Sequence, residues 1–276
     1  MITLENVHKA FGSKHVLQGV NLTIEKGTSM VIIGGSGTGK SVMLKSVLGL
    51  VTPDSGQITV DGNDVQKGDR DAFLARFGML FQGGALFDSL PVWQNVAFRL
   101  LRGALKRPKH EAREIAIEKL RRVGLKPETA DLFPAELSGG MQKRVGLARA
   151  IAAEPEIIFF DEPTTGLDPM SRISLWEEVR RLNKEGTTVM LTTQYLEEAD
   201  QLADRIAIID QGNIVREGKP QELKASVGFP TLLVTVPNDQ LDRAKAVLAA
   251  FGDMRPTAEG TLGVGLRGGA EAVTDV

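Results

Sequence analysis

The chain has 276 residues, of which 42% are hydrophobic and 25% charged, so it can bury a core in one large domain or in one large and one small domain. The chain has 33 lysines and arginines and 35 aspartates and glutamates, so its formal charge is -2. This charge gives no electrostatic reason to expect nucleic acid or an anionic membrane as a direct partner, although binding through one local basic patch is not excluded. The absence of cysteine excludes disulfides, thiolate metal sites and cysteine nucleophiles.

The N-terminal stretch gives no sign of export or membrane insertion. It lacks the basic start, the long apolar stretch and the small-residue cleavage site of a signal peptide. No window reaches the roughly 18 consecutive apolar residues that a spanning helix needs. We therefore expect a cytoplasmic chain without direct membrane insertion, so that any membrane role must come through a partner.

Strand and helix patterns alternate along most of the chain. The first thirty residues carry alternating strands, at 2–7 and 20–24, that suggest an antiparallel flank. Unbroken apolar strands between amphipathic helices then predict an α/β fold with a mostly parallel core sheet, covered on both faces. The predicted core strands are 29–33, 157–160, 188–191 and 206–209, and the predicted helices are 40–50, 110–123, 141–153, 171–184 and 196–203.

The pattern changes twice. A stretch of low periodicity at 78–91 precedes a helix-rich stretch, which we expect to form a helical subdomain at about 90–155 of one large domain, residues 1–227. Residues 228–276 predict a small α+β appendage with a strand at 231–236, a helix at 239–251 and a strand at 261–266. Residues 268–272 begin like a helix that the chain does not complete, so we expect the appendage to be shortened.

The strongest motif follows the apolar run at 29–33 and precedes a predicted helix. Its spacing is that of a phosphate-binding loop, G-x-x-x-x-G-K-[ST], in the strand-loop-helix context that the motif requires. Glycines let backbone N–H groups converge on phosphate oxygens, the lysine neutralises the β- and γ-phosphates, and the serine supplies a Mg²⁺ ligand. The sequence therefore predicts a site for a nucleoside triphosphate with Mg²⁺, made of Gly34, Gly35, Ser36, Gly37, Thr38, Gly39, Lys40 and Ser41.

Two acidic residues end the apolar strand at 157–160. Asp161 lies where a magnesium ion held by Ser41 would need a second protein ligand. Glu162 then suits a general base for a water molecule that attacks the γ-phosphate. An isolated Asp-Glu pair could simply end a strand, but beside a nucleotide loop we interpret it as catalytic.

A second potential anion site precedes the alanine-rich helix predicted at 141–153. Ser138, Gly139 and Gly140 place backbone N–H groups and one hydroxyl group at the helix N-terminus, followed by Gln142. Alone, such a sequence is an ordinary helix entry. Beside the first two motifs it suggests a γ-phosphate held from a second side.

These motifs together resemble those of an ABC transporter ATP-binding subunit, in their order and spacing, over about residues 1–220. The resemblance implies that Phe11 stacks on adenine and that Gln82 senses magnesium and the attacking water. It also implies that Ser138 to Gln142 form the signature, which contacts nucleotide held by the opposite subunit, and that Asp168 belongs to a loop linking the two sites. The residues that carry it are Gly34 to Ser41, Gln82, Leu137 to Gln142, Asp161-Glu162 and Gly166-Leu167-Asp168.

One set of motifs supplies half of each active site, since a lone chain cannot bring its own signature to its own phosphate loop. We therefore expect a head-to-tail homodimer with two ATP molecules between the subunits. The resemblance also implies integral membrane permease subunits as partners, which would hold the protein at the inner face of the cell membrane. It implies ATP hydrolysis coupled to transport, with closure on ATP and opening after hydrolysis.

Two parts of the sequence resemble two kinds of transporter. Residues 81–98 and the phosphate-binding loop resemble the ATPases of bacterial phospholipid-trafficking systems, and residues 81–98 lie where family members touch the permease. Residues 192–204 and the appendage resemble daunorubicin-resistance drug exporters. We favour a lipid or lipid-like amphipathic substrate because the permease-facing region carries that resemblance, with the drug exporter as the alternative.

Three other functions are less consistent with the sequence. An ABC ATPase acting on DNA would carry a long coiled-coil insertion before the signature, and a translation-associated one two sets of motifs; neither is present. A regulatory module without hydrolysis would be expected to lose Glu162, which the chain retains.

Gln194 stands at the end of the strand predicted at 188–191, where most relatives carry a histidine that contacts the γ-phosphate. A glutamine amide can donate to a phosphate and accept from water, but it takes up no proton at physiological pH. The three histidines, His8, His15 and His110, lie outside this motif. Base catalysis therefore falls to Glu162, and Gln194 is expected to position the reacting groups.

From this we predict that the curve of ATPase rate against pH has no limb caused by a histidine titrating at about pH 6.5. The measurement is the steady-state rate from about pH 5.5 to 8.5. Gln194→His that raised turnover and introduced such a limb would identify the glutamine as a brake. Gln194→Ala with unchanged turnover would contradict the positioning role.

Overall fold

The computed structural model describes residues 1–227, 231–255, 257 and 261–266. The chain divides into two compact units, Met1–Pro220 and Gln221–Val276. The predicted boundary after residue 227 falls at the end of helix α8, Pro220–Val227, whereas the observed division falls at its start, so the domain boundary stays a prediction. The incomplete helix predicted at 268–272 lies outside the described residues. No helix in the described part of the chain is long and apolar enough to cross a membrane.

A six-stranded sheet forms the centre of the first unit, in the order β10-β9-β3-β8-β7-β6. Its strands are parallel except β10, which pairs antiparallel with β9. All residues of β3, β7 and β8 are buried, as expected for apolar, β-branched strands covered on both faces. The bounds are Ser29–Ile33 for β3, Phe77–Leu80 for β6, Ile157–Asp161 for β7, Thr188–Thr193 for β8, Arg205–Asp210 for β9 and Asn213–Gly218 for β10.

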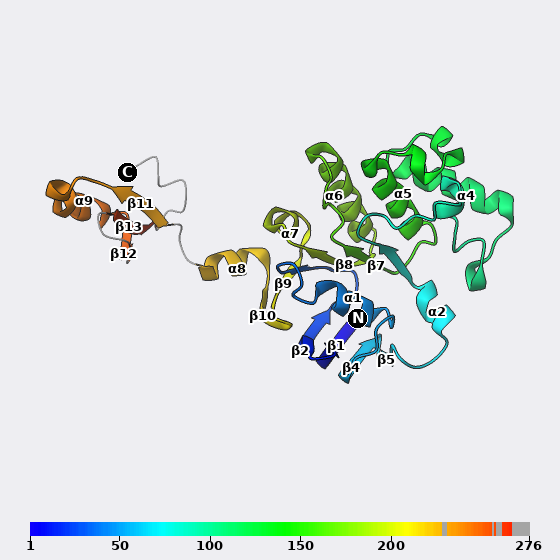
Figure 1. The fold of residues 1–276 in the computed structure, drawn as a ribbon, viewed down its shortest axis with the longest axis horizontal. Coiled ribbons are helices and arrows are strands. Elements are labelled where there is room, and N and C mark those ends of the chain that lie inside the picture. The colour runs from blue at the N-terminus through cyan, green and yellow to red at the C-terminus, as the bar shows by residue number, and fades with distance from the viewer. Residues whose placement is uncertain (228–230, 256, 258–260, 267–276) are drawn as a thin grey trace. The chain divides into compact units, whose positions relative to one another are not determined.

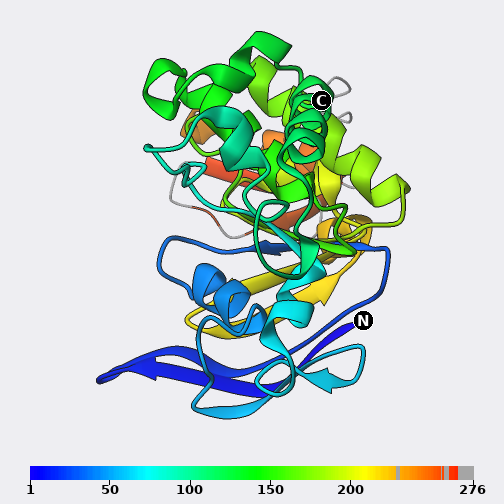
Figure 2. The same ribbon diagram turned by 90° about the vertical axis from the view of Figure 1, so that its right-hand side faces the viewer.

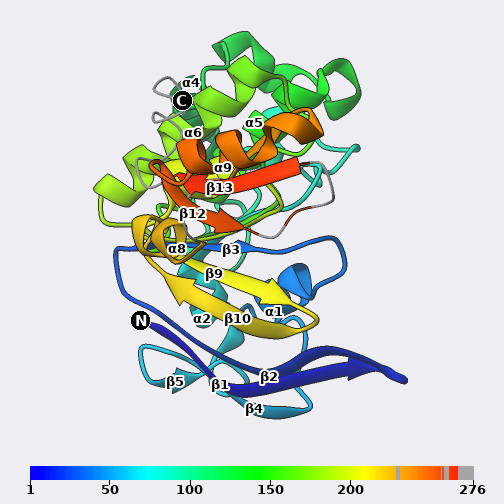
Figure 3. The same ribbon diagram turned by 90° about the vertical axis from the view of Figure 1, so that its left-hand side faces the viewer.

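A second, antiparallel sheet of the order β2-β1-β4-β5 forms a separate layer (Figure 3). Helix α1, Lys40–Val47, lies between the two sheets (Figure 1). Its apolar residues Met43, Leu44 and Val47 are fully buried in one core cluster with residues of both sheets, which fixes the start of the helix beside the end of β3. The strand bounds are Ile2–Phe11 for β1, Lys14–Ile24 for β2, Ser55–Val60 for β4 and Asn63–Asp64 for β5.

The helices between β6 and β7 gather at the end of the first unit that lies away from the antiparallel sheet (Figure 2). Helix α5 packs on α3, α4 and β6, and it approaches β6 closely at Gly146, where a Cβ atom would lie 2.8 Å from Leu80 Cδ1. The remaining helices of the unit follow β7 and β8 or precede β6. The bounds are Arg70–Ala75 for α2, Val92–Val96 for α3, Lys109–Arg122 for α4, Gly139–Ile151 for α5, Pro169–Lys184 for α6 and Leu196–Leu202 for α7, with 3-10 turns η1, Gly103–Leu105, η2, Pro127–Asp131, and η3, Pro134–Glu136.

The second unit contains a three-stranded antiparallel sheet of the order β11-β13-β12 with helix α9. Leu248, Leu262 and Val264 form its buried core. This confirms the strand, helix and strand predicted in the appendage and adds β12. The bounds are Thr231–Thr235 for β11, Asn238–Gln240 for the 3-10 turn η4, Leu241–Leu248 for α9, Gly252–Arg255 for β12 and Thr261–Leu266 for β13.

The predicted fold class is confirmed, with some local corrections. The stretch of low periodicity at 78–91 begins inside a real strand, β6, which the sequence analysis missed. Gly78 interrupts the apolar pattern there because a side chain at this position would meet the carbonyl oxygen of Ala150 at 2.3 Å. Strand β10, which has only two apolar residues, and helix α2, which has only six residues, were also missed.

Candidate functional site

The phosphate-binding loop connects β3 to α1. Gly39 adopts φ 106°, and a Cβ atom there would lie 2.7 Å from the carbonyl oxygen of Val16, so this position requires glycine. No side chain of the described residues caps the first turn of α1, which leaves its N–H groups for an anion. The ammonium group of Lys40 donates to the carbonyl oxygens of Gly34 and Gly35, both at 2.8 Å.

Ser41 and Asp161 meet across the start of α1 and the end of β7. The Ser41 hydroxyl donates to Asp161 Oδ1 at 2.9 Å, and Thr192 Oγ1 donates to the same oxygen at 2.8 Å. Asp161 is only 5% exposed. No group of three or more His, Asp or Glu side chains gathers in the part of the chain that the structure describes. The hydroxyl and carboxylate oxygens fit Mg²⁺, which completes its shell with water and phosphate oxygens.

Glu162 is the point at which three further predicted residues converge. Its carboxylate lies 3.2 Å from Lys40 Nζ and accepts hydrogen bonds from Gln194 Nε2 at 3.0 Å and Gln82 Nε2 at 3.4 Å. Its backbone takes a left-handed conformation, φ 45°, which costs energy for a residue other than glycine. The N–H group of Glu162 donates to the carbonyl oxygen of Thr192 at 3.0 Å, which helps to hold this conformation.

Thr192 was missed by the sequence analysis, although it contacts both acidic residues. Its hydroxyl donates to Asp161, and its backbone carbonyl accepts from Glu162. The signal was present in the sequence, because Thr192 and Thr193 end an otherwise apolar strand. Polar residues at the carboxyl end of a buried parallel strand point to a site at that edge of the sheet.

The signature residues lie apart from this cluster. Ser138 caps its own helix α5 by accepting from Met141 N at 3.3 Å, and Gln142 Nε2 donates to the carbonyl oxygen of Pro134 at 2.9 Å. No hydrogen bond or ion pair within the described ranges joins Ser138–Gln142 to the phosphate-binding loop. Gly139 and Gly140 form the first turn of α5.

The remaining predicted residues, Phe11 and Asp168, lie at the surface. Phe11 ends β1 and is 53% exposed, with Lys9 Nζ 5.3 Å from its ring centroid. Asp168 begins helix α6 by accepting from Ser171 N at 3.0 Å, and this hydrogen bonding lowers the pKa of its carboxyl group. Within the described residues, neither side chain forms a hydrogen bond or ion pair with Glu162 or Lys40.

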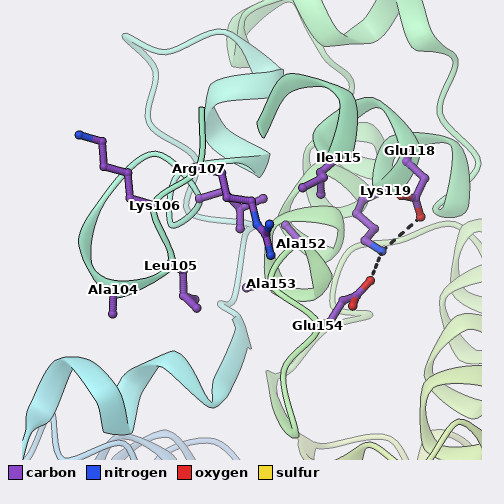
Figure 4. Close-up of a pocket in the computed structure, with 11 residues that line it drawn as sticks. Ala104, Leu105, Lys106, Arg107, Ile115, Glu118, Lys119, Ala152, Ala153 and Glu154 are labelled. Carbon is purple, nitrogen blue, oxygen red and sulfur yellow. Dashed lines mark hydrogen bonds and ion pairs between the residues drawn. The ribbon is translucent and has the colours of Figure 1, made fainter. Parts of the chain in front are cut away.

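Hollows also lie elsewhere in the first unit. One of about 400 Å³ lies between η1, α4 and the end of α5 (Figure 4). In the wall of this hollow, Lys119 forms ion pairs with Glu118 at 3.2 Å and with Glu154 at 3.0 Å. The charges of these three residues therefore compensate one another. None of the predicted site residues lines it. Another hollow, of about 310 Å³, is a mostly apolar groove lined by Leu48, Leu50, Leu74, Phe77, Gly78, Met79, Phe81, Phe87, Phe98, Arg99, Arg149 and Ala150.

Comparison with known proteins assigns the family. The family model described as ABC transporter matches residues 17–165. The chain belongs to the ABC transporter family. It is 41% identical to the daunorubicin resistance ATP-binding protein DrrA3 of Streptomyces coeruleorubidus, over 91% of this chain and 78% of the relative. It is 40% identical to the glutamine transport ATP-binding protein GlnQ of Bacillus subtilis, over 82% of this chain and 93% of the relative.

A solved structure of the ABC cassette MJ0796 shares the fold with a TM-score of 0.73 and 34% identity, over 80% of this chain and 99% of that one. That structure is a dimeric, post-hydrolysis state bound to ADP and phosphate. The present chain is an ATP-binding subunit of an ABC transporter and has the cassette fold of an ATPase. The names of its relatives cover both drug resistance and amino acid transport.

Lys40→Ala is predicted to weaken ATP binding at least about tenfold, because phosphate charge would lose its neutralising ammonium group. A titration with a fluorescent ATP analogue measures the change. Lys45→Ala is the matched control, since Lys45 lies on the same helix but is exposed in its last turn. Unchanged affinity in Lys40→Ala would contradict the assignment of the loop.

Proposed function

We propose that this ATPase powers the movement of a lipid or lipid-like amphipathic molecule through a membrane permease. In this proposal it works as a homodimer with ATP and Mg²⁺, on the cytoplasmic side of the membrane to which the permease holds it. The observation that carries the catalytic part is the convergence of Lys40, Gln82 and Gln194 on Glu162.

The proposed roles follow from the chemistry of each group. Glu162 is the general base, since it is the carboxylate that three predicted site residues surround. Gln194 and Gln82 position the base and the attacking water, because an amide can both donate and accept hydrogen bonds. Lys40 neutralises phosphate charge, and Ser41 and Asp161 would hold Mg²⁺, which supplies further neutralisation when bound.

The separation of the signature from the phosphate-binding loop supports a homodimer. Ser138, Gly139, Gly140 and Gln142 would contact the nucleotide of the second subunit, as would Asp168 on its neighbouring loop. Their helices start side by side, since a Cβ atom on Gly140 would lie 3.5 Å from Ser171 Oγ. Phe11 would stack on the adenine of its own subunit, which its exposed ring allows.

The apolar groove supports a permease partner. Leu50 and Phe87 at the groove are 50% and 43% exposed, and the rings of Phe87 and Phe98 stack with centroids 4.4 Å apart. Buried Asn95 holds this loop in place by accepting from Phe87 N at 2.7 Å and donating to the carbonyl oxygen of Leu90 at 2.9 Å. A preformed apolar groove fits the apolar face of a short helix from the permease.

The proposal also specifies the class of the transported substrate. The resemblance of residues 81–98, which contribute Phe81, Phe87 and Phe98 to this groove, favours the lipid type. A daunorubicin-type exporter is the second candidate, favoured by 41% identity to DrrA3 over 91% of this chain. Stimulation of the ATPase of the reconstituted complex by phospholipid would support the first, and stimulation by daunorubicin alone would support the second.

Glu162→Gln is predicted to reduce ATP turnover at least about a hundredfold while ATP binding remains, because the base is lost but the binding groups are not. Size-exclusion chromatography with ATP should then show a stable dimer, consistent with a trapped closed state. Glu197→Gln is the control, since Glu197 is an exposed acid on α7. Normal turnover in Glu162→Gln would exclude Glu162 as the base.

Phe87→Asp is predicted to abolish co-purification with the permease, because a charge in the groove opposes burial of an apolar helix face. The measurement is the amount of permease retained from detergent-solubilised membranes. Phe133→Asp is the matched control, since Phe133 has the same exposure of 43% but does not line the groove. Equal retention by both variants would show that the permease docks elsewhere.

A further inference from the structure

A buried glutamate lies behind the catalytic cluster. Glu198 stands in the first turn of α7, four residues after Gln194, and is fully buried. Its Oε1 accepts a hydrogen bond from Trp176 Nε1 at 3.0 Å. Trp176 belongs to α6, the helix that begins after Asp168. One side chain therefore ties the segment that carries Gln194 to the helix that follows Asp168.

Three polar atoms around this glutamate have no hydrogen-bond partner within the described structure. They are Glu198 Oε2, Thr164 Oγ1 and Arg172 Nε, and the only other such buried atom in the described residues is Ser29 Oγ. Unpaired buried polar groups are rare and costly, so their gathering at one place points to a functional constraint.

The unpaired groups are complementary and close to one another. Burial raises the pKa of the Glu198 carboxyl group, whereas the hydroxyl groups of Thr193 and Thr164 and the charge of Arg172 favour its charged form. A hydroxyl or guanidinium N–H group can donate to the free carboxylate oxygen. Small side-chain rotations would therefore complete the network around Glu198.

The network also reaches the segments that carry Glu162 and Gln194. Thr164 lies two residues after Glu162, and Thr193 immediately precedes Gln194. Lys143 of α5 donates to the carbonyl oxygen of Thr165. Burial lowers the pKa of Lys143, and the charge of nearby Glu198 partly offsets this effect. The carboxylate of Glu198 thus faces groups from α5, α6, β8 and the loop after β7.

We propose that Glu198 is a positioning residue of the ATPase reaction, which holds Gln194 against Glu162 by anchoring α7 to Trp176 of α6. This rests on the positioning role proposed for Gln194. Loss of the anchor would let α7 shift and lengthen the hydrogen bond of 3.0 Å between Gln194 and Glu162. None of the side chains around Glu198 belongs to the phosphate-binding loop, residues 34–41. The effect should therefore fall on the chemical step and spare ATP binding.

The test compares two substitutions of Glu198 in the full-length protein. Glu198→Leu removes both oxygens at similar volume, and we expect kcat to fall about tenfold with KM for ATP changed less than about twofold. Glu198→Gln should restore kcat to within about threefold of wild type, because its amide can accept from Trp176 and donate to Thr164. A wild-type kcat in soluble, folded Glu198→Leu would overturn the proposal.

Glu178 provides a matched control. It is also a buried glutamate, on α6, but it pairs with Arg122 and Arg181, away from Gln194. Glu178→Leu should lower the melting temperature yet leave kcat within about twofold. A tenfold loss of kcat in this variant too would mean that any buried charge lost near α6 has the same effect, which would overturn a specific role for Glu198.

A double-mutant cycle then asks whether Glu198 acts through Gln194. If it does, the second substitution should add little to the first. The kcat of the double variant Gln194→Ala, Glu198→Leu should then lie within about twofold of the kcat of the slower single variant. Two losses that multiply would overturn the proposal. Unchanged turnover in Gln194→Ala alone would instead refute the role proposed for Gln194, so the two failures are distinguishable.

Trp176→Phe decides the question if Glu198→Leu does not fold. It keeps an aromatic side chain but removes the indole donor to Glu198. We expect kcat to fall about fivefold, with KM for ATP unchanged within about twofold. A wild-type kcat in this variant would contradict the anchor between α6 and α7.

Discussion

The parallel pairing of β3 with β8 and of β8 with β7 is the constraint on which the site depends. Parallel neighbours end at one edge of the sheet, so the residues that follow three separate strands meet there. Lys40 follows β3, Glu162 follows β7 and Gln194 follows β8, and the ion pair between Lys40 and Glu162 closes the group at 3.2 Å. The register pairs Ile33 with Thr193 and Asp161 with Thr192, so the three strands end level with one another.

The sequence predicted most of this edge because each residue follows a strand with a strong apolar pattern. It also predicted the antiparallel flank, where alternation is clear. It missed β6, a strand of four residues in which Gly78 breaks the pattern to admit the carbonyl oxygen of Ala150. The contact of Glu198 with Trp176 could not be predicted, since it joins residues on different helices through tertiary packing.

The signature residues show what cannot be learned when only one chain is considered. Their positions in the sequence are recognisable, but Ser138 and Gln142 make their hydrogen bonds within the helical region. In the proposed homodimer, their partner is the nucleotide of the second subunit, which a single chain does not include. The proposed occupant of the groove around Phe87 is likewise outside the single chain, so only the apolar lining can be described.

The hydrogen bond between Trp176 and Glu198 gives the molecule a natural optical reporter. Indole emission responds to the electric field and hydration around the ring, and here the ring donates directly to a buried carboxyl group. The sequence has two tryptophans, and the other, Trp93, lies on α3. A chain with phenylalanine in place of Trp93 would carry a single emitter at the junction of α6 and α7. Movements of the segment behind Gln194 could then be followed in real time without an attached dye.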